Sequence, residues 1–326
     1  MPLGRRIEST EGITLPDISS TPKESTSRDA DGAKGSGSDA FRMFQAEKPK
    51  YSFSDIILNS DTYDTIQDVL AIYEKHHVIF DEWGLSATHK QQNQIGINLY
   101  GVPGTGKTMA AHAVAKQLGR RILTVDYSQI ESKYVGETSK NLVAMFAYAK
   151  ESNAIIFFDE ADALLSKRVT DMSNSTDVSV NQTRSVLLVL INDYNDMILF
   201  ATNFITNYDP AFMRRILAHI KFDYPNEANR LKLWSLYIPK TLPTDADIKI
   251  LSSKYSNISG ADISNAVFTA TLRAARLNEA IVKHTYFEDA IERIIKSKED
   301  NKDMTFSKRT VSEDYVKSQF GGVLPK

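Results

Sequence analysis

The segment GVPGTGKT, residues 101 to 108, constrains the fold of this chain more than any other feature of its sequence. It fits the pattern G-x-x-x-x-G-K-S/T at every fixed position, and it lies between an apolar run and a stretch of helical periodicity. Glycines in this pattern let the backbone turn, so that successive N–H groups and a helix N-terminus face a phosphate. The segment therefore predicts a strand, a phosphate-binding loop and a helix in succession, as in parallel α/β sheets.

Two side chains of this loop have chemical roles in such a site. Lys107 is expected to neutralise the β- and γ-phosphate oxygens of ATP, and the Thr108 hydroxyl is expected to ligate Mg²⁺. The residues expected to contact ATP or ADP in this loop are Gly101, Val102, Pro103, Gly104, Thr105, Gly106, Lys107, Thr108 and Met109.

An acidic pair follows one strand-helix unit later, in IIFFDE, residues 155 to 160. A buried strand here would deliver Asp159 and Glu160 to the carboxyl edge of the sheet, where open α/β sheets bind ligands. Asp159 is expected to hold Mg²⁺ together with Thr108, and Glu160 to polarise the water that attacks the γ-phosphate. An Asp after a strand also often caps the next helix, and the role of Asp162 stays open.

Asn203 ends another apolar run, in LFATN. From a strand beside the one that ends at Asp159, it could orient the attacking water with Glu160. On its own, an Asn after a strand is more often a turn residue.

Apolar runs alternate with helical periodicity and predict a five-stranded parallel sheet sandwiched by helices. The expected strands are residues 97–100, 121–126, 154–159, 197–202 and 218–224, and the expected helices are residues 62–77, 107–118, 139–152 and 181–193. After Pro225 only helical periodicity remains, which predicts a small all-helical lid domain. The expected organisation is a disordered leader (1–50), a large α/β domain (51–225), the lid (226–298) and a tail (299–326).

Composition narrows the function classes. The chain has 39 Lys and Arg against 41 Asp and Glu, so its total charge does not indicate a nucleic-acid partner or an anionic membrane. With no cysteine it can form neither a disulfide nor a thiolate metal site. The longest apolar run, VLLVLI at 186–191, is far shorter than a membrane span of about 20 residues. We expect a cytoplasmic protein with no membrane partner.

In combination and order, these motifs resemble those of the AAA family of ATPases, in the branch with an aromatic pore loop, over about residues 51–298. GVPGTGKT resembles the Walker A motif of that family, with Val102 in place of the commoner Pro, IIFFDE resembles Walker B, and ATN resembles sensor 1. SGADIS, residues 259–264, resembles the sensor 2 region, which implies that Gly260 and Ala261 pack near the adenine.

The resemblance extends to YDPAFMRR, residues 208–215, which is similar to the arginine-finger segment of the family. It implies that Arg214 and Arg215 reach the γ-phosphate of a neighbouring subunit. Adjacent arginines are typical of microtubule-severing members, whereas many proteases and segregases have a second arginine where this chain has Leu217. From the residues alone, the pair could also be a solvated helix end.

The family assembles as rings of six subunits, so the resemblance implies a homohexamer whose central channel faces the loop ESKYVGETSK, residues 131–140. An aromatic side chain beside an aliphatic one can grip an extended polypeptide without reading its sequence. The expected pore-loop residues are Lys133, Tyr134, Val135 and Gly136. Alternatively, the Tyr134 ring packs back on the following helix. The polar segment at 169–182 is either a second, mobile pore loop or a linker.

The function expected from these features is that of an ATP-hydrolysing, Mg²⁺-dependent ring that threads a protein client and unfolds, remodels or disassembles it. A nucleic-acid motor or loader and a nucleotide-switched scaffold that does not thread are the alternatives. The compact chain also resembles bacterial Pch2/TRIP13-like remodellers of HORMA proteins, which implies a HORMA-type or adaptor partner and a role in antiviral defence.

Overall fold

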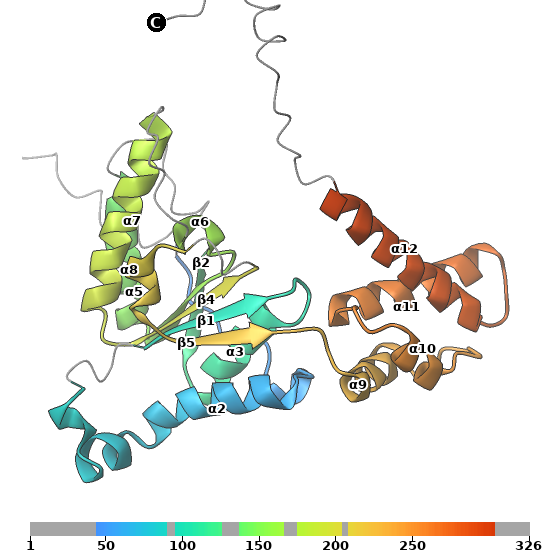
Figure 1. Ribbon diagram of the computed structural model, residues 1–326, viewed down its shortest axis with the longest axis horizontal. Helices are drawn as coiled ribbons and strands as arrows, with labels where there is room; N and C mark the ends of the chain where they lie inside the picture. The colour runs from blue at the N-terminus through green and yellow to red at the C-terminus, as the bar shows by residue number, and fades with distance from the viewer. Residues whose placement is uncertain (1–43, 90–94, 126–136, 166–174, 204–207, 304–326) are drawn as a thin grey trace, which may run out of the picture. The chain divides into compact units, whose positions relative to one another are not determined.

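The computed structural model describes residues 44–89, 95–125, 137–165, 175–203 and 208–303, all within one compact unit, Gly37–Lys326. Five parallel strands form the sheet: β1 (Ile95–Gly101), β2 (Arg121–Val125), β3 (Ala154–Phe158), β4 (Met197–Thr202) and β5 (Ile216–Phe222). Their order across the sheet is β2-β3-β4-β1-β5 (Figure 1). The carboxyl ends of β1, β3 and β4, which precede the predicted site residues, therefore lie side by side.

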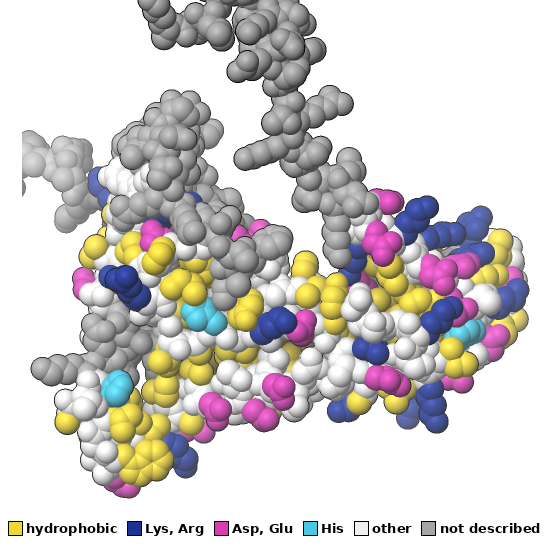
Figure 2. All heavy atoms as spheres, viewed as in Figure 1, with side chains coloured by type: hydrophobic (Ala, Val, Ile, Leu, Met, Phe, Trp, Pro, Cys, Tyr) yellow, Lys and Arg dark blue, Asp and Glu magenta, His cyan; other side chains and the backbone are white. Residues whose placement is uncertain are grey.

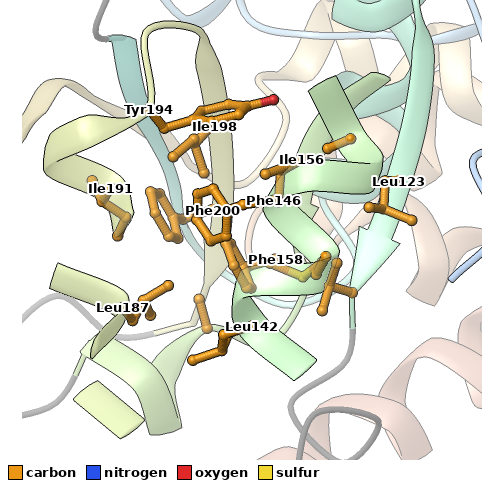
Figure 3. Packing of buried hydrophobic residues seen from close by; sticks show 14 of the residues in the cluster. Leu123, Leu142, Phe146, Ile156, Phe158, Leu187, Ile191, Tyr194, Ile198 and Phe200 are labelled. Carbon is orange, nitrogen blue, oxygen red and sulfur yellow. The ribbon is translucent and has the colours of Figure 1, made fainter. Parts of the chain in front are cut away.

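Helices cover both faces of this sheet (Figure 1). On one face, Ile97 and Leu99 of β1 pack in a core with α2 (Ser60–Glu74) and α3 (Lys107–Gln117). On the other, Phe158 and Phe200 stack at 5.4 Å in a core with α5 (Glu137–Glu151) and α7 (Ser175–Asp193), shown in Figure 3. Every residue of β3 and β4 is buried, as expected for strands covered on both faces. The predicted fold class is confirmed.

Short elements complete the large domain, and the local sequence explains where α3 ends. These elements are η1 (Phe53–Asp55), η2 (His77–Glu82), η3 (Leu85–Ala87), α6 (Asp162–Leu165) and α8 (Pro210–Met213). Gly119 follows α3 with φ of 65°, a left-handed conformation that glycine adopts without strain, and its N–H donates to the Lys116 carbonyl. The predicted end of this helix is confirmed.

In the described part of the chain after β5, through residue 303, there are four helices: α9 (Glu227–Tyr237), α10 (Ile248–Lys254), α11 (Gly260–Arg276) and α12 (His284–Asp303). They enclose their own core, in which the rings of Trp234 and Phe287 meet edge to face with centroids 6.1 Å apart. Helix α12 continues to Asp303, past the expected lid boundary at residue 298. The first residues of the expected tail are therefore helical. A helix that is stabilised by packing can continue into polar sequence that lacks helical apolar periodicity.

Residues 44–50, which were expected to belong to a disordered leader, are part of the described fold. Phe44 and Ala46 are buried in the core that also contains residues of α5. The Glu47 N–H donates to the Ile122 carbonyl at 2.9 Å, and the Ile122 N–H donates back to the Glu47 carbonyl at 3.0 Å. Since β2 lies at the edge of the sheet, its free backbone groups accept this short antiparallel partner. The sequence signal for the contact between Glu47 and Ile122 was weak: aromatic residues such as Phe44 in an otherwise polar tract.

Helix α7 begins at Ser175, not near residue 181 as predicted. Part of the polar segment at 169–182 is therefore helical and is neither a loop nor a linker. Its Ser, Thr, Asn and Asp residues are poor helix formers in isolation, so the composition did not predict a helix. The helix is stabilised by packing of its later turns, at Leu187 and Ile191.

The surface shows no dominant charge on the side drawn in Figure 2. Basic and acidic side chains are interspersed over the lid helices in that view. Among the described residues, no helix is both long enough and apolar enough to cross a membrane.

Candidate functional site

A cavity of about 560 Å³ lies at the carboxyl ends of β1, β3 and β4. It brings together most of the residues predicted to form the site, from three strand ends and from the start of α11. Those that line it are Pro103, Gly104, Thr105, Gly106, Lys107, Thr108, Met109, Asp159, Glu160, Asn203, Gly260 and Ala261.

The loop between β1 and α3 has the backbone that its glycines predict. Gly101, Gly104 and Gly106 have φ of 132°, 75° and 99°, values that side-chain-bearing residues rarely adopt. Gly101 also has no room for a side chain, since a Cβ there would lie 2.2 Å from the Phe222 carbonyl oxygen of β5. Helix α3 thus begins at Lys107 directly after a tight turn, which leaves its first N–H groups available at the cavity.

The ammonium group of Lys107 is held at the base of this loop. It donates to the carbonyls of Gly101 at 2.8 Å and Val102 at 3.1 Å, and to the side-chain oxygen of Asn203 at 3.0 Å. Burial lowers the pKa of Lys107 from its ordinary 10.5, and the nearby carboxylates of Asp159 and Asp162 act in the opposite direction. The residue places a positive charge at the end of the cavity where the loop amides also converge.

Thr108 and Asp159 meet at the mouth of the loop. The Thr108 hydroxyl donates to Asp159 Oδ2 at 2.9 Å, although the two residues come from different strand-helix units. A hydroxyl and a carboxylate oxygen side by side are ligands of the kind that Mg²⁺ binds beside a phosphate. The predicted pair of metal ligands is therefore adjacent in space.

Glu160 follows in a strained backbone conformation. Its φ is 53°, and its N–H donates to Asp159 Oδ1 at 3.0 Å. A non-glycine residue in the left-handed region costs about 1–3 kcal/mol, and such residues are enriched at functional sites. This turn leaves the Glu160 side chain exposed at the cavity wall instead of pointing into the core.

Asn203 is fixed from both ends. Its side-chain oxygen accepts from Lys107, and its N–H donates to Asp162 Oδ2 at 3.3 Å. The role of Asp162, which the sequence left open, includes this contact. Asn203 therefore lies within one hydrogen-bonded group with the phosphate-binding loop and the acidic segment after β3.

The lid closes against the same loop. The Ala261 N–H donates to the Gly104 carbonyl at 3.2 Å, and a Cβ on Gly104 would lie 2.7 Å from the Ala261 Cβ and 2.8 Å from the Ser259 hydroxyl. Ser259 caps α11 in a capping box with Asp262, whose carboxylate also binds the Lys298 ammonium of α12. Sequence analysis did not identify Lys298, because nothing in the local sequence links it to the loop.

Several other cavity residues were also missed. They come from the segment before α2, from the first turn of α2 and from α9: Asp55, Ile56, Ile57, Leu58, Asn59, Thr62, Leu233, Leu236 and Tyr237. An apolar triplet, Ile56–Leu58, directly before a predicted helix was the available signal, but it matches no motif. Apolar side chains near the glycine loop provide the kind of wall that a purine base requires.

The two arginines after α8 differ in their surroundings. Arg214 is exposed, whereas Arg215 is half-buried and its Nη1 donates to the Ala211 carbonyl at 2.7 Å. Neither is among the residues that line the cavity. Arg214 is therefore the one whose side chain is presented outward. The predicted pore-loop residues Lys133, Tyr134, Val135 and Gly136 lie outside the described residues.

The polar groups that line this cavity fit a nucleotide bound with Mg²⁺. A glycine loop with free helix N–H groups and the Lys107 cation suit a polyphosphate, and the oxygens of Thr108 and Asp159 suit its metal ion. An acidic side chain, Glu160, lies exposed beside them.

Comparison with known proteins gives a consistent result. Residues 97–224 match the ATPase family associated with various cellular activities (AAA). The chain is 34% identical over 257 residues to a proteasome-activating nucleotidase of Sulfurisphaera tokodaii, which covers 76% of this chain and 64% of that protein. It is 33% identical over 239 residues to a 26S proteasome regulatory subunit 8 homolog of Encephalitozoon cuniculi, covering 71% and 59%. The chain thus spans about three fifths of the length of these curated relatives.

Proposed function

Residues 97–224 form an ATPase domain of the AAA family, and we propose that this chain uses ATP hydrolysis to unfold or remodel a protein client. The observation that carries the proposal is the convergence of Lys107, Thr108, Asp159, Glu160 and Asn203 on one cavity. The prediction of an ATPase is confirmed at the level of the domain, and the residue roles that follow are our proposal.

Each residue contributes one step of the proposed hydrolysis. Lys107 and the loop amides bind the phosphate oxygens, while Thr108 and Asp159 hold the metal ion. Glu160 accepts a hydrogen bond from the attacking water and orients it in line, and Asn203 fixes that water from the other side. Bound Mg²⁺-ATP supplies the scissile phosphate and its charge-balancing cation. Because little covalent chemistry is required, correct placement of these groups accounts for most of the rate enhancement.

One cation is missing from this arrangement within a single subunit. Among the described residues lining the cavity, Lys107 is the basic one. An arginine supplied from a neighbouring subunit accelerates finger-dependent nucleotidases by ~10³ to 10⁵. We propose that Arg214, exposed after α8, supplies it to an adjacent copy in a homohexameric ring. Hydrolysis would then depend on assembly.

The relatives point to the client. Their names refer to the proteasome, so a polypeptide is a better-supported substrate for this chain than a nucleic acid. The interspersed charges on the face in Figure 2 agree with this preference. We propose that Tyr134, with Lys133, Val135 and Gly136, grips the polypeptide in the channel. The finer expectation of a HORMA-type or adaptor partner in antiviral defence finds no support in these relatives.

The proposal is tested with a fluorescent protein that carries an unstructured extension, mixed with the full chain and ATP. Wild-type protein should abolish the fluorescence in an ATP-dependent reaction. Glu160→Gln should bind ATP and retain the client without unfolding it, and Tyr134→Ala should hydrolyse ATP but leave the client folded.

Two outcomes would contradict parts of this proposal. Normal ATP turnover by Glu160→Gln would remove Glu160 from the chemistry. Full unfolding activity in Tyr134→Ala would show that the client is not threaded by this loop, and a conformational scaffold would then be the better description. Stimulation of turnover by single- or double-stranded nucleic acid, and not by protein, would favour a nucleic-acid motor.

A further inference from the structure

A fully buried polar residue lies within β1, an interior strand of the sheet. Asn98 lies in the middle of β1, with exposure of 0%, and its register partners are Phe200 of β4 and His219 of β5. The neighbouring Ile97 and Leu99 face α2 and α3, so Asn98 lies on the opposite face, the one covered by α5 and α7. A buried amide is costly unless its hydrogen bonds are made, and its partners therefore matter.

Asn98 is part of a chain of hydrogen bonds that crosses three strands. The Thr202 hydroxyl of β4 donates to Asn98 Oδ1 at 3.4 Å, and Asn98 Nδ2 lies 3.4 Å from His219 Nδ1 on β5. The Tyr208 hydroxyl in turn donates to Thr202 Oγ1. Thr202 and Tyr208 are 1% and 6% exposed, so little water competes for these bonds.

Two members of this hydrogen-bonded group, Thr202 and Tyr208, border the two parts of the proposed catalytic machinery. Thr202 immediately precedes Asn203, which contacts Lys107. Tyr208 immediately precedes Asp209, which caps α8 by accepting from the Ala211 N–H at 2.8 Å, and α8 ends just before Arg214. A hydroxyl-to-hydroxyl contact thus joins the strand end at the nucleotide site to the start of the arginine-bearing turn.

A second link runs beside the first. The Asp209 N–H donates to the Leu165 carbonyl at the end of α6, and α6 begins at Asp162, which accepts from the Asn203 N–H. Phe212, within α8, is 1% exposed in the core. The short helix α8 is consequently fixed at its start and in its middle, while Arg214 at its end is exposed.

We propose that Asn98, Thr202 and Tyr208 are positioning residues that fix Asn203 and Arg214 relative to each other. A displacement of Asn203 at a subunit's own nucleotide would then be transmitted to the arginine that this subunit presents to its neighbour. The inference rests on the proposed function, since it assumes that Asn203 acts in the chain's own site and Arg214 in the adjacent one. None of the three residues touches the nucleotide cavity.

The first test removes single hydroxyl groups. Tyr208→Phe and Thr202→Val should each lower kcat for ATP about tenfold, the effect of losing roughly one positioning hydrogen bond, while KM stays within about twofold. Thr202→Ser keeps the hydroxyl and should restore most of the turnover. The matched control is Tyr194→Phe, which removes a hydroxyl that is buried in the same core and has no hydrogen-bond partner among the described residues. Its kcat should equal that of the wild type.

The second test separates the two sites. Glu160→Gln subunits, which assemble but hardly hydrolyse ATP, are mixed into wild-type rings so that they mainly donate Arg214 to their neighbours. If Tyr208→Phe is added to the Glu160→Gln subunit, the turnover of the wild-type neighbours should fall further. A Glu160→Gln subunit that also carries Arg214→Ala should lower this turnover in the same direction and serves as the reference. A mixture unaffected by Tyr208→Phe would overturn the link to Arg214.

Failure of this inference can be distinguished from failure of the proposed function. If Asn203→Ala and Arg214→Ala both turn over ATP at the wild-type rate, the proposed site roles are wrong. If those two variants are impaired but Tyr208→Phe matches Tyr194→Phe, the positioning role alone is wrong. Equal losses in Thr202→Ser and Thr202→Val, measured at matched thermal stability, would also overturn it, because a packing effect would explain both.

Discussion

The Lys107 ammonium lies 3.0 Å from the side-chain oxygen of Asn203, although the two residues are 96 positions apart in the chain. The contact exists because β1 and β4 are neighbours in the sheet, so the residues that follow them emerge at the same edge. It makes Asn203 an acceptor for the cation that the proposed mechanism assigns to the phosphates. The charge at position 203 should therefore control nucleotide affinity.

Asn203→Asp and Asn203→Ala separate this charge effect from the loss of the amide. The aspartate would place a negative charge beside Lys107 and repel the phosphates, so we expect ATP affinity to fall about tenfold or more. The alanine should lower kcat while affinity changes by less than about threefold. Isothermal titration with ATP and steady-state kinetics measure the two effects. Equal affinities for the two variants would contradict the electrostatic argument.

Gly104 should tolerate no side chain, for a reason that differs from backbone strain alone. Gly104→Ala would place a Cβ 2.7 Å from Ala261 and 2.8 Å from the Ser259 hydroxyl, which forces the start of α11 away from the loop. We expect nucleotide affinity to fall at least about tenfold. Gly119→Ala is the control. Gly119 has a similar φ of 65°, but an added Cβ would meet no atom of the described residues within 4 Å, so this variant should lose about 1 kcal/mol of stability and bind nucleotide normally. Weakened binding in both variants would implicate strain instead.

Much of the large domain could be predicted from sequence because its signals are local and redundant. Five apolar runs, each followed by helical periodicity, specify a parallel sheet with covered faces, and the strands lie where these runs predict them. The glycine loop and the acidic pair are short motifs whose chemistry requires fixed spacing. Their convergence then follows from the rule that ligands bind at the carboxyl ends of parallel strands.

The contacts that sequence analysis missed depend on long-range packing. Lys298 reaches Asp262 only because α12 folds back along α11, and Glu47 pairs with Ile122 only because β2 is an edge strand. Ser175 begins a helix in polar sequence because the later turns of α7 are packed. In each case, a residue with a weak local preference is placed by a distant element, which periodicity cannot detect.

Lys298 should support nucleotide binding from a distance. Its ammonium pairs with the carboxylate of Asp262, which is 7% exposed and completes the α11 cap beside Gly104. Among the described residues, Lys298→Met would leave this carboxylate with the Ser259 donors alone, so we expect about threefold to tenfold weaker ADP binding and about 1 kcal/mol lower stability.

A fluorescent ADP analogue and thermal unfolding measure these two effects of Lys298→Met. The control is Lys283→Met, which breaks the exposed pair with Glu279 on the same domain and should change neither quantity by much. If the two variants bind ADP equally well, the cap of α11 does not depend on Lys298.

His112 should make the stability of the fold depend on pH. Burial lowers the pKa of His112 from the ordinary 6.5, and its Nδ1 accepts a hydrogen bond from the Lys50 N–H at 3.3 Å. The folded protein therefore favours the neutral imidazole. As pH falls below about 6.5, the unfolded chain takes up the proton first, and the free energy of unfolding decreases until the folded pKa is passed. His219, whose pKa burial also lowers, adds to this decrease.

His112→Asn keeps an acceptor near Nδ1 but cannot be protonated, so urea unfolding at pH 7.5 and 5.5 should show a smaller loss of stability than in the wild type. An undiminished loss would assign the effect to other groups.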